Sequence, residues 1–220
     1  MRGASILFLV SLGLFAETRT IPLDPAAMKA LNVKVENVKD YKGPPAVRVT
    51  DVAPPDANDG MRLVLLPGTE FADGTLEVDV TGALVPNAME GARGFVGLAF
   101  RVAADGSRFE CFYLRPTNGR AEDQLQRNHS TQYIAFPDFP WQKARSEFPS
   151  KYESYTDLVP GEWTHVKIAV KGDGARLYVN EVTQPTLIVN DLKHGNSQGG
   201  IALWVGPGTL AHFANLKVSR

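Results

Sequence analysis

The chain has 220 residues, of which 44% are hydrophobic and 21% are charged, and its 23 basic and 24 acidic residues give a formal net charge of −1. This length suits one large domain, and the balanced charge supplies no broad positive field for nucleic acid or anionic lipid. Because Cys111 is the single cysteine, an internal disulfide and a cysteine-pair metal site are excluded. We expect a protein stabilised by core packing that does not bind nucleic acid.

The first 16 residues have the layout of a secretory signal peptide. Arg2 gives a basic start, Ile6–Phe15 is mostly apolar, and Ala16 supplies a small residue before a polar segment. The apolar run is shorter than the roughly 20 residues that span a bilayer, and no later segment is long and apolar enough to do so. We expect residues 1–16 to be removed and the mature protein to be exported, to the periplasm or the extracellular space, without a membrane span.

Residues 17–32 form a lead-in, whose only helix signal is Asp24-Pro25 before two alanines. From Val33 onward, apolar and polar residues alternate with a period of two, and dipeptides such as Asp73-Gly74 mark turns. This pattern favours an all-β fold, a two-sheet antiparallel jelly-roll sandwich formed by one domain over residues 33–220. Strands are predicted around Val33–Val35 and Val47–Val49, and at Met61–Leu66, Thr75–Thr81, Gly94–Ala103, Arg108–Arg115, Glu162–Lys171, Ala175–Asn180, Gly200–Val205 and Leu210–Val218.

A long loop region, residues 116–160, interrupts the strand pattern. It contains five prolines and only a weak strand signal at Thr131–Phe136. Loops longer than about 15 residues are unusual in compact domains and are mostly functional or disordered. The many aromatic residues argue against disorder, and prolines around Trp141 hold its ring ready to stack on a ligand. We therefore expect this region to border a binding site.

Strand parity assigns the side chains to two faces. In Gly94–Ala103 the alternate apolar residues form a core set, and Arg101 is predicted to point outward beside Arg115 of the next strand. A face with cations and aromatic rings suits a sugar, because charged groups hydrogen-bond to hydroxyls and rings stack on C–H faces. The substrate-binding residues predicted on this face and in the adjoining loop are Arg101, Tyr113, Arg115, Asn118, Gln132, Tyr133, Trp141, Lys167 and Trp204.

Three motifs in the second half of the chain carry a family resemblance. They are G-E-W-T-H-V-K-I at Gly161–Ile168, A-R-L-Y-V-N at Ala175–Asn180 and F-A-N-L-K-V at Phe213–Val218. With them, the segment Val33–Val218 resembles the concanavalin A-like jelly-roll domains of the laminin-G and 3-keto-disaccharide hydrolase type. The resemblance implies the sandwich fold and an exported protein that binds or processes carbohydrate, whereas fold alone implies little about activity.

Catalytic candidates lie mainly in the long loop. The E-x-D-x-x-E pattern of family-16 glycosidases starts at Glu77 and Asp79, but Gly82 replaces the second glutamate, so paired-carboxylate chemistry is incomplete. A 3-keto-glycoside hydrolase or lyase needs a base and an electrophile instead, because the keto group acidifies the neighbouring C–H. For that alternative the predicted catalytic residues are His129, Glu153 and Asp123.

No cofactor is predicted, because the four histidines lack the spacing of metal ligands. A calcium site through Asp123, Asn128 or Asp157 stays open, although no calcium-loop spacing is present. The leading hypothesis is a domain that recognises a carbohydrate ligand. The alternatives are a 3-keto-glycoside enzyme and a protein-interaction module, and the latter should expose an extended apolar patch.

Overall fold

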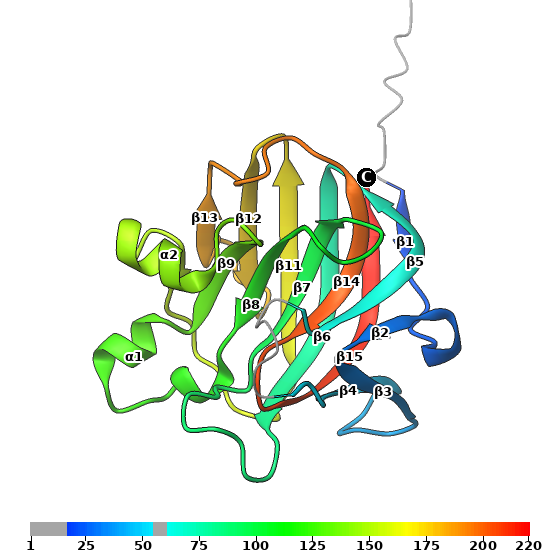
Figure 1. Ribbon diagram of the computed structural model, residues 1–220, viewed down its shortest axis with the longest axis horizontal. Helices are drawn as coiled ribbons and strands as arrows, with labels where there is room; N and C mark the ends of the chain where they lie inside the picture. Colours follow the sequence, from blue (N-terminus) through cyan, green and yellow to red (C-terminus); the bar gives the residue numbers. More distant parts are fainter. Residues whose placement is uncertain (1–16, 55–60) are drawn as a thin grey trace, which may run out of the picture.

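Apolar side chains from two antiparallel sheets meet in the core of the computed structural model, which describes residues 17–54 and 61–220 (Figure 1). Val78, Phe213 and Ile168 of one sheet pack with Phe100 and Leu203 of the other, and all five are 2% exposed or less. The predicted all-β, two-sheet jelly-roll sandwich is therefore confirmed. The predicted signal peptide lies outside the described residues, and no helix within them is long and apolar enough to cross a bilayer.

Sheet A has eight strands among the described residues. From one edge to the other they are β13 (Leu187–Val189), β12 (Gly174–Val179), β11 (Thr164–Lys171), β6 (Gly74–Leu84), β15 (Thr209–Ser219), β4 (Ala46–Asp51) and β3 (Val33–Val38), and β1 (Thr18–Thr20) also pairs with β15.

Sheet B has seven strands in the same part of the chain. Their order is β10 (Glu153–Ser154), β9 (Thr131–Phe136), β8 (Phe109–Leu114), β7 (Val96–Val102), β14 (Gly199–Val205), β5 (Leu63–Phe71) and β2 (Lys29–Leu31). The segment 17–32, predicted as a lead-in, thus adds one strand to each sheet.

The long region 116–160 folds against sheet B. The weak strand signal at Thr131–Phe136 becomes β9, and the region also contributes the edge strand β10. Figure 1 shows two short helices beside β9, which the sequence pattern did not predict. Within the described residues, the helical segments are η1 (Pro25–Ala27), η2 (Pro116–Asn118), α1 (Gln124–Asn128) and α2 (Trp141–Glu147).

A β-bulge at Arg101 reverses the predicted direction of this side chain. Arg101 has a φ of 53°, and the pairing of β14 with β7 skips it between Phe100 and Val102. Gly199 permits the close approach, because a Cβ there would lie 2.5 Å from the carbonyl oxygen of Val102. The extra residue shifts the alternation, so Val102 packs on the outer face and Arg101 points to the end of the sandwich. The prediction that Arg101 lies on the outer face with Arg115 is wrong.

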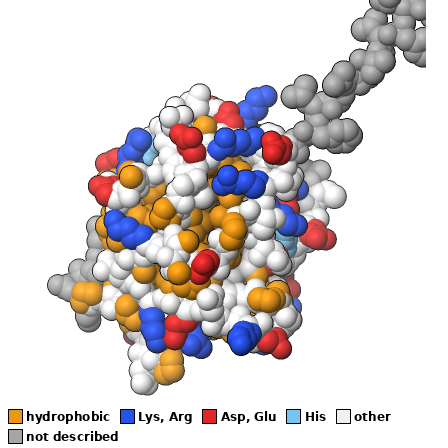
Figure 2. Space-filling model, turned by 90° about the vertical axis from the view of Figure 1, so that its right-hand side faces the viewer, with side chains coloured by type: hydrophobic (Ala, Val, Ile, Leu, Met, Phe, Trp, Pro, Cys, Tyr) orange, Lys and Arg blue, Asp and Glu red, His pale blue; other side chains and the backbone are white. Residues whose placement is uncertain are grey.

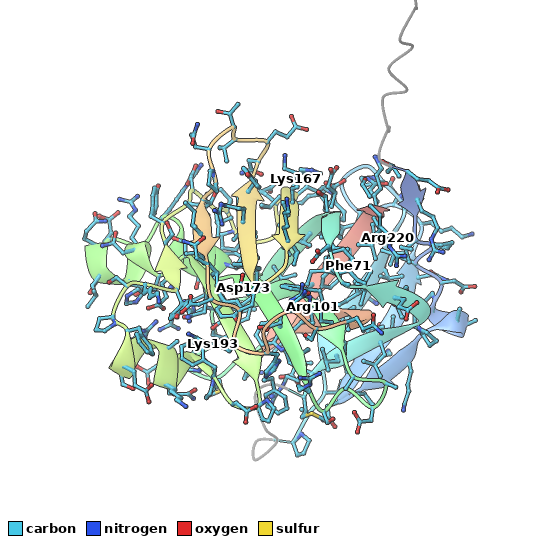
Figure 3. All side chains as sticks on the ribbon, turned by 90° about the horizontal axis from the view of Figure 1, so that it is seen from above. Phe71, Arg101, Lys167, Asp173, Lys193 and Arg220 are labelled. Carbon is cyan, nitrogen blue, oxygen red and sulfur yellow. The ribbon has the colours of Figure 1, made fainter. Side chains whose placement is uncertain are left out.

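The buried guanidinium of Arg101 joins three loops. It donates to the carbonyl oxygens of Ala72 at 2.9 Å, Gly195 at 2.7 Å and Gly172 at 2.7 Å, and to the carboxylate of Asp73 at 3.1 Å. Figure 3 looks onto this end of the molecule and shows Arg101 near its centre. Arg101 therefore links, through its hydrogen bonds, the loops at one end of the sandwich.

We expect Arg101→Met to lower the free energy of unfolding by about 2–4 kcal/mol, because several acceptors lose a charged donor. Denaturant unfolding followed by tryptophan fluorescence measures the change. Arg108→Met is the matched control, since Arg108 belongs to the same hairpin and is exposed, and it should change stability by less than about 0.5 kcal/mol. Equal stabilities of the two variants would contradict a fastening role for Arg101.

Candidate functional site

A groove with a volume of about 1080 Å³ lies on the outer face of sheet B; we call it the sheet B groove. This volume is slightly above the range of about 300–1,000 Å³ that is usual for small-molecule sites, so the groove has room for a ligand of more than one ring. The long region 116–160 and the loop before β7 supply its borders. The floor and lower walls are aromatic or aliphatic and are formed by Phe95, Tyr113, Ile134, Phe136, Trp141 and Trp204.

The aromatic floor follows from strand register. Gly97 of β7 is paired with Tyr113 on one side and with Trp204 on the other. A Cβ at position 97 would come within 2.5 Å of the Cβ of Tyr113, so only glycine leaves room there. The rings of Tyr113 and Trp204 consequently lie 4.7 Å apart, and Phe95 packs edge-on against Tyr113 at 6.0 Å. The outward parity predicted for Tyr113 and Trp204 is confirmed.

The indole of Trp204 is 4% exposed, yet its Nε1 atom has no hydrogen-bond partner among the described residues. An indole N–H is a donor only, and buried donors are normally paired. Trp204 also lines the groove, so the floor contains a buried N–H without a protein acceptor among the described residues.

Arg115 organises the polar end of the sheet B groove. Its Nη1 donates to Glu153 Oε1 at 3.1 Å and to the carbonyl oxygen of His129 at 3.0 Å, and its Nη2 donates to Tyr113 Oη and Gln132 Oε1, both at 2.8 Å. Asn118 donates to the same carbonyl of His129 at 3.1 Å. These bonds hold the aromatic floor and the long loop in one fixed arrangement.

The carboxylate of Glu153, whose side chain is 3% exposed, is the common partner of the positively charged side chains at the polar end of the groove. It accepts from Arg115 and Arg145, and His129 Nε2 lies 3.5 Å from its Oε2. Burial would raise the pKa of Glu153, but the hydrogen bond from Arg145 and the charge of Arg115 outweigh burial and hold this pKa below its usual value. Glu153 is therefore an anion that positions cations and not a proton donor at neutral pH.

His129 lines the sheet B groove, and its side chain is 14% exposed. Burial lowers the pKa of the imidazole, and the neighbouring carboxylate of Glu153 only partly offsets this effect. The imidazole is consequently neutral at pH 7 and has the protonation state of a base. Asp123 also lines the groove, where its Oδ1 caps α1 by accepting from the amide of Gln126 at 2.9 Å.

Two further placements predicted from the sequence are wrong. Tyr133 points into the core, because β9 alternates and Gln132 and Ile134 occupy the outer face; its hydroxyl bonds to the buried Glu110. Lys167 lies on β11 of sheet A, with its ammonium 4.5 Å from the ring of Tyr178, and Figure 3 shows it in a different layer from Arg101. The sequence pattern identified outward residues without showing which sheet they belong to.

The structure thus brings together most of the predicted site. Of the substrate-binding candidates, Tyr113, Arg115, Asn118, Trp141 and Trp204 line the sheet B groove, and Gln132 stands behind Arg115 as its acceptor. The lining residues that sequence reasoning missed include Arg93, Phe95, Ile134, Phe136, Lys143 and Arg145. The alternation of side chains along β9 could have placed Ile134 and Phe136 on the outer face. Lys143 and Arg145 could have been placed only if the sequence had predicted α2.

The residues considered for calcium bind protein groups instead. Asn128 Oδ1 accepts from Gln124, and both carboxylate oxygens of Asp157 accept from Arg120. Across residues 17–54 and 61–220, no three His, Cys, Asp or Glu side chains come together in a group suited to a metal ion. Asp123, Asn128 and Asp157 thus each have a side-chain oxygen engaged with a protein donor.

A second hollow of about 400 Å³ lies between β1, β3, β4 and β15 and is lined mainly by apolar side chains and backbone. Figure 2 shows the side of the molecule where β1 to β3 lie, with hydrophobic side chains gathered in its middle and charged ones among and around them. Lys39 is the only charged residue that lines this hollow among the described residues. This second hollow lacks the converging polar side chains that make the sheet B groove the stronger candidate for a ligand site.

Comparison of the sequence with known protein families and with curated proteins finds no match. Among solved structures, the chain is similar to the carbohydrate-binding module CBM66 from Bacillus subtilis, with a TM-score of 0.60 and 17% identity over 88% of this chain and 96% of that one. It is also similar to a protein of unknown function with a galectin-like fold from Bacillus subtilis, with a TM-score of 0.58 and 11% identity over 93% and 98% of the two chains. At these identities the likeness shows the fold.

The lowered pKa of Glu153 makes a pH-dependent prediction. Because the folded-state pKa lies below the unfolded value, the ionised carboxylate stabilises the fold above about pH 4.3, and this contribution is lost as the pH falls through the folded-state pKa. We expect Glu153→Gln to lower the free energy of unfolding by about 3 kcal/mol at pH 7. The stability difference from wild type should narrow as the pH is lowered below the ordinary pKa of a glutamate, about 4.3.

Denaturant unfolding at a series of pH values measures this difference. Glu122→Gln serves as control, because Glu122 is exposed, and its difference from wild type should stay within about 0.5 kcal/mol at every pH. A Glu153→Gln difference that is constant with pH would show that the carboxylate does not stabilise the site through its charge.

Proposed function

We propose that the protein binds a carbohydrate in the sheet B groove. The observation that carries the proposal is the aromatic floor, in which Tyr113 and Trp204 lie 4.7 Å apart, while the donors Arg93 and Lys143 line the same groove. Sugar rings present apolar C–H faces that pack on such rings and hydroxyl edges that bond to such donors. The unpaired indole nitrogen of Trp204 and the fold shared with a carbohydrate-binding module support the same ligand class.

A preformed arrangement favours binding. Arg115 makes four hydrogen bonds, and Arg145 of α2 both bonds to Glu153 and lies with its guanidinium 5.0 Å from the ring of Trp141. Side chains that are already fixed lose little conformational entropy when a ligand arrives. Export through the predicted signal peptide is part of the proposal, because it would bring the protein to extracellular or periplasmic polysaccharides.

The three tryptophans allow a direct test. We expect Trp141→Ala to weaken oligosaccharide binding by about fivefold or more, since a stacking surface is lost. Trp204→Phe keeps most of the ring but removes the N–H, and it should weaken binding by about three- to tenfold. Isothermal titration calorimetry against a panel of neutral and acidic oligosaccharides measures both.

Trp163→Phe is the matched control, because Trp163 donates to the carbonyl oxygen of Tyr41 at 2.9 Å and does not line the groove. Its affinity for the same oligosaccharides should equal that of wild type. If wild type binds no member of the panel, or if Trp163→Phe weakens binding as much as Trp141→Ala, the proposed site is wrong.

A second candidate function, acid–base cleavage of a 3-keto-glycoside, is favoured by His129. Its neutral imidazole lines the groove with Nε2 3.5 Å from the Glu153 carboxylate, which could stabilise the imidazolium after proton abstraction. Under this hypothesis, incubation with 3-keto-disaccharides should release monosaccharide, and His129→Asn should slow release by about 100-fold or more. Unchanged substrate after incubation with wild type would remove the enzyme hypothesis and leave sugar binding standing.

A further inference from the structure

The charged side chains around the sheet B groove are mostly positive. Arg93 comes from the loop before β7, Arg115 follows β8, and Lys143 and Arg145 belong to α2. Among the described residues, Asp123 is the only carboxylate that lines the groove, and Glu153 lies beneath it as a second anion. Since the whole chain has a formal net charge of −1, this positive surplus is a local property of the groove.

Two of these cations have no carboxylate partner. Arg115 and Arg145 are both paired with Glu153. Arg93 Nη1 donates only to the carbonyl oxygens of Glu90 and Ala92, each at 2.7 Å, and Lys143 donates to the carbonyl oxygen of Asp138 at 3.3 Å. Within the described part of the chain, neither Arg93 nor Lys143 is within ion-pair distance of an acid. Their charges are therefore available to a ligand.

The hydrogen-bonding character of the groove points the same way. Arginine, lysine and the indole N–H are donors only, whereas Asp123 is the single charged acceptor on the described lining. A neutral sugar hydroxyl both donates and accepts, whereas the two lining cations without a carboxylate partner, Arg93 and Lys143, can only donate. A carboxylate or sulfate only accepts, and charge-assisted hydrogen bonds to it are the stronger kind.

We infer that the ligand of the sheet B groove is an anionic saccharide, a sugar chain bearing carboxylate or sulfate groups. Arg93 and Lys143 contact its acidic groups, while the aromatic floor takes the sugar rings. This inference rests on the proposed function and specifies its ligand class. Arg93 and Lys143 come from different elements, so the groove can contact acidic groups on more than one sugar unit of the saccharide.

The test compares saccharides that differ in charge and little else. Calorimetry with an oligouronate, its carboxyl-reduced neutral counterpart and a sulfated oligosaccharide separates the carboxylate from the sulfate as the recognised group. We expect at least one acidic ligand to bind about tenfold or more tightly than the neutral counterpart. Raising the salt concentration from about 0.05 M to about 0.5 M should weaken acidic binding severalfold and leave neutral binding unchanged.

A pair of double variants locates the effect. Arg93→Gln with Lys143→Gln should weaken acidic binding by about fivefold or more and leave neutral binding within about twofold. The matched control, Arg108→Gln with Lys171→Gln, removes the same charge from exposed positions that do not line the groove. It should bind the acidic ligand as wild type does.

The outcomes separate the two levels of the hypothesis. Neutral ligands that bind as well as acidic ones would overturn the charge inference and leave sugar binding intact. Acidic binding that both double variants weaken equally would also overturn it, because net charge and not the groove would be responsible. If neither acidic nor neutral saccharides bind, the charge inference and the proposed function both fail.

Discussion

The buried ion pair between Arg115 and Glu153 is the constraint on which the sheet B groove depends. Arg115 directly follows β8, Glu153 begins the edge strand β10, and the 37 residues between them include β9 and the short helices. Closing a loop of this length costs entropy, and a buried, multiply hydrogen-bonded pair offsets part of that cost. Arg145 and His129 join the same carboxylate. One anion therefore fixes α2, the end of α1 and the aromatic floor relative to sheet B.

The strands and their faces could be predicted from the sequence because alternation is a local property. Tyr113 and Trp204 share the outer face as predicted, and β9 appears at the weak signal Thr131–Phe136. Arg101 was misplaced because its bulge depends on a glycine of a distant strand, Gly199, which no local pattern contains. Lys167 was misplaced because alternation says which way a side chain points but not which sheet it belongs to.

The helices that border the site could not be predicted from the local sequence pattern, for a different reason. Both α1 and α2 are short, with five and seven residues, and short helices owe their stability to tertiary contacts more than to propensity. The side chains of Ala144 and Arg145 make those contacts, in the core and with Glu153. Two of the cations that line the groove, Lys143 and Arg145, belong to α2, so the charge of the ligand could be inferred only from the structure.

Occupation of the sheet B groove by sugar can be followed through the three indole N–H resonances in a ¹H–¹⁵N spectrum during titration with an oligosaccharide. Trp141 and Trp204 line the groove, whereas Trp163 packs against Tyr41 near sheet A. If sugar binds in the groove, the resonances of Trp141 and Trp204 shift saturably while that of Trp163 stays in place. A saturable shift of Trp163 alone, with the other two unchanged, would contradict it.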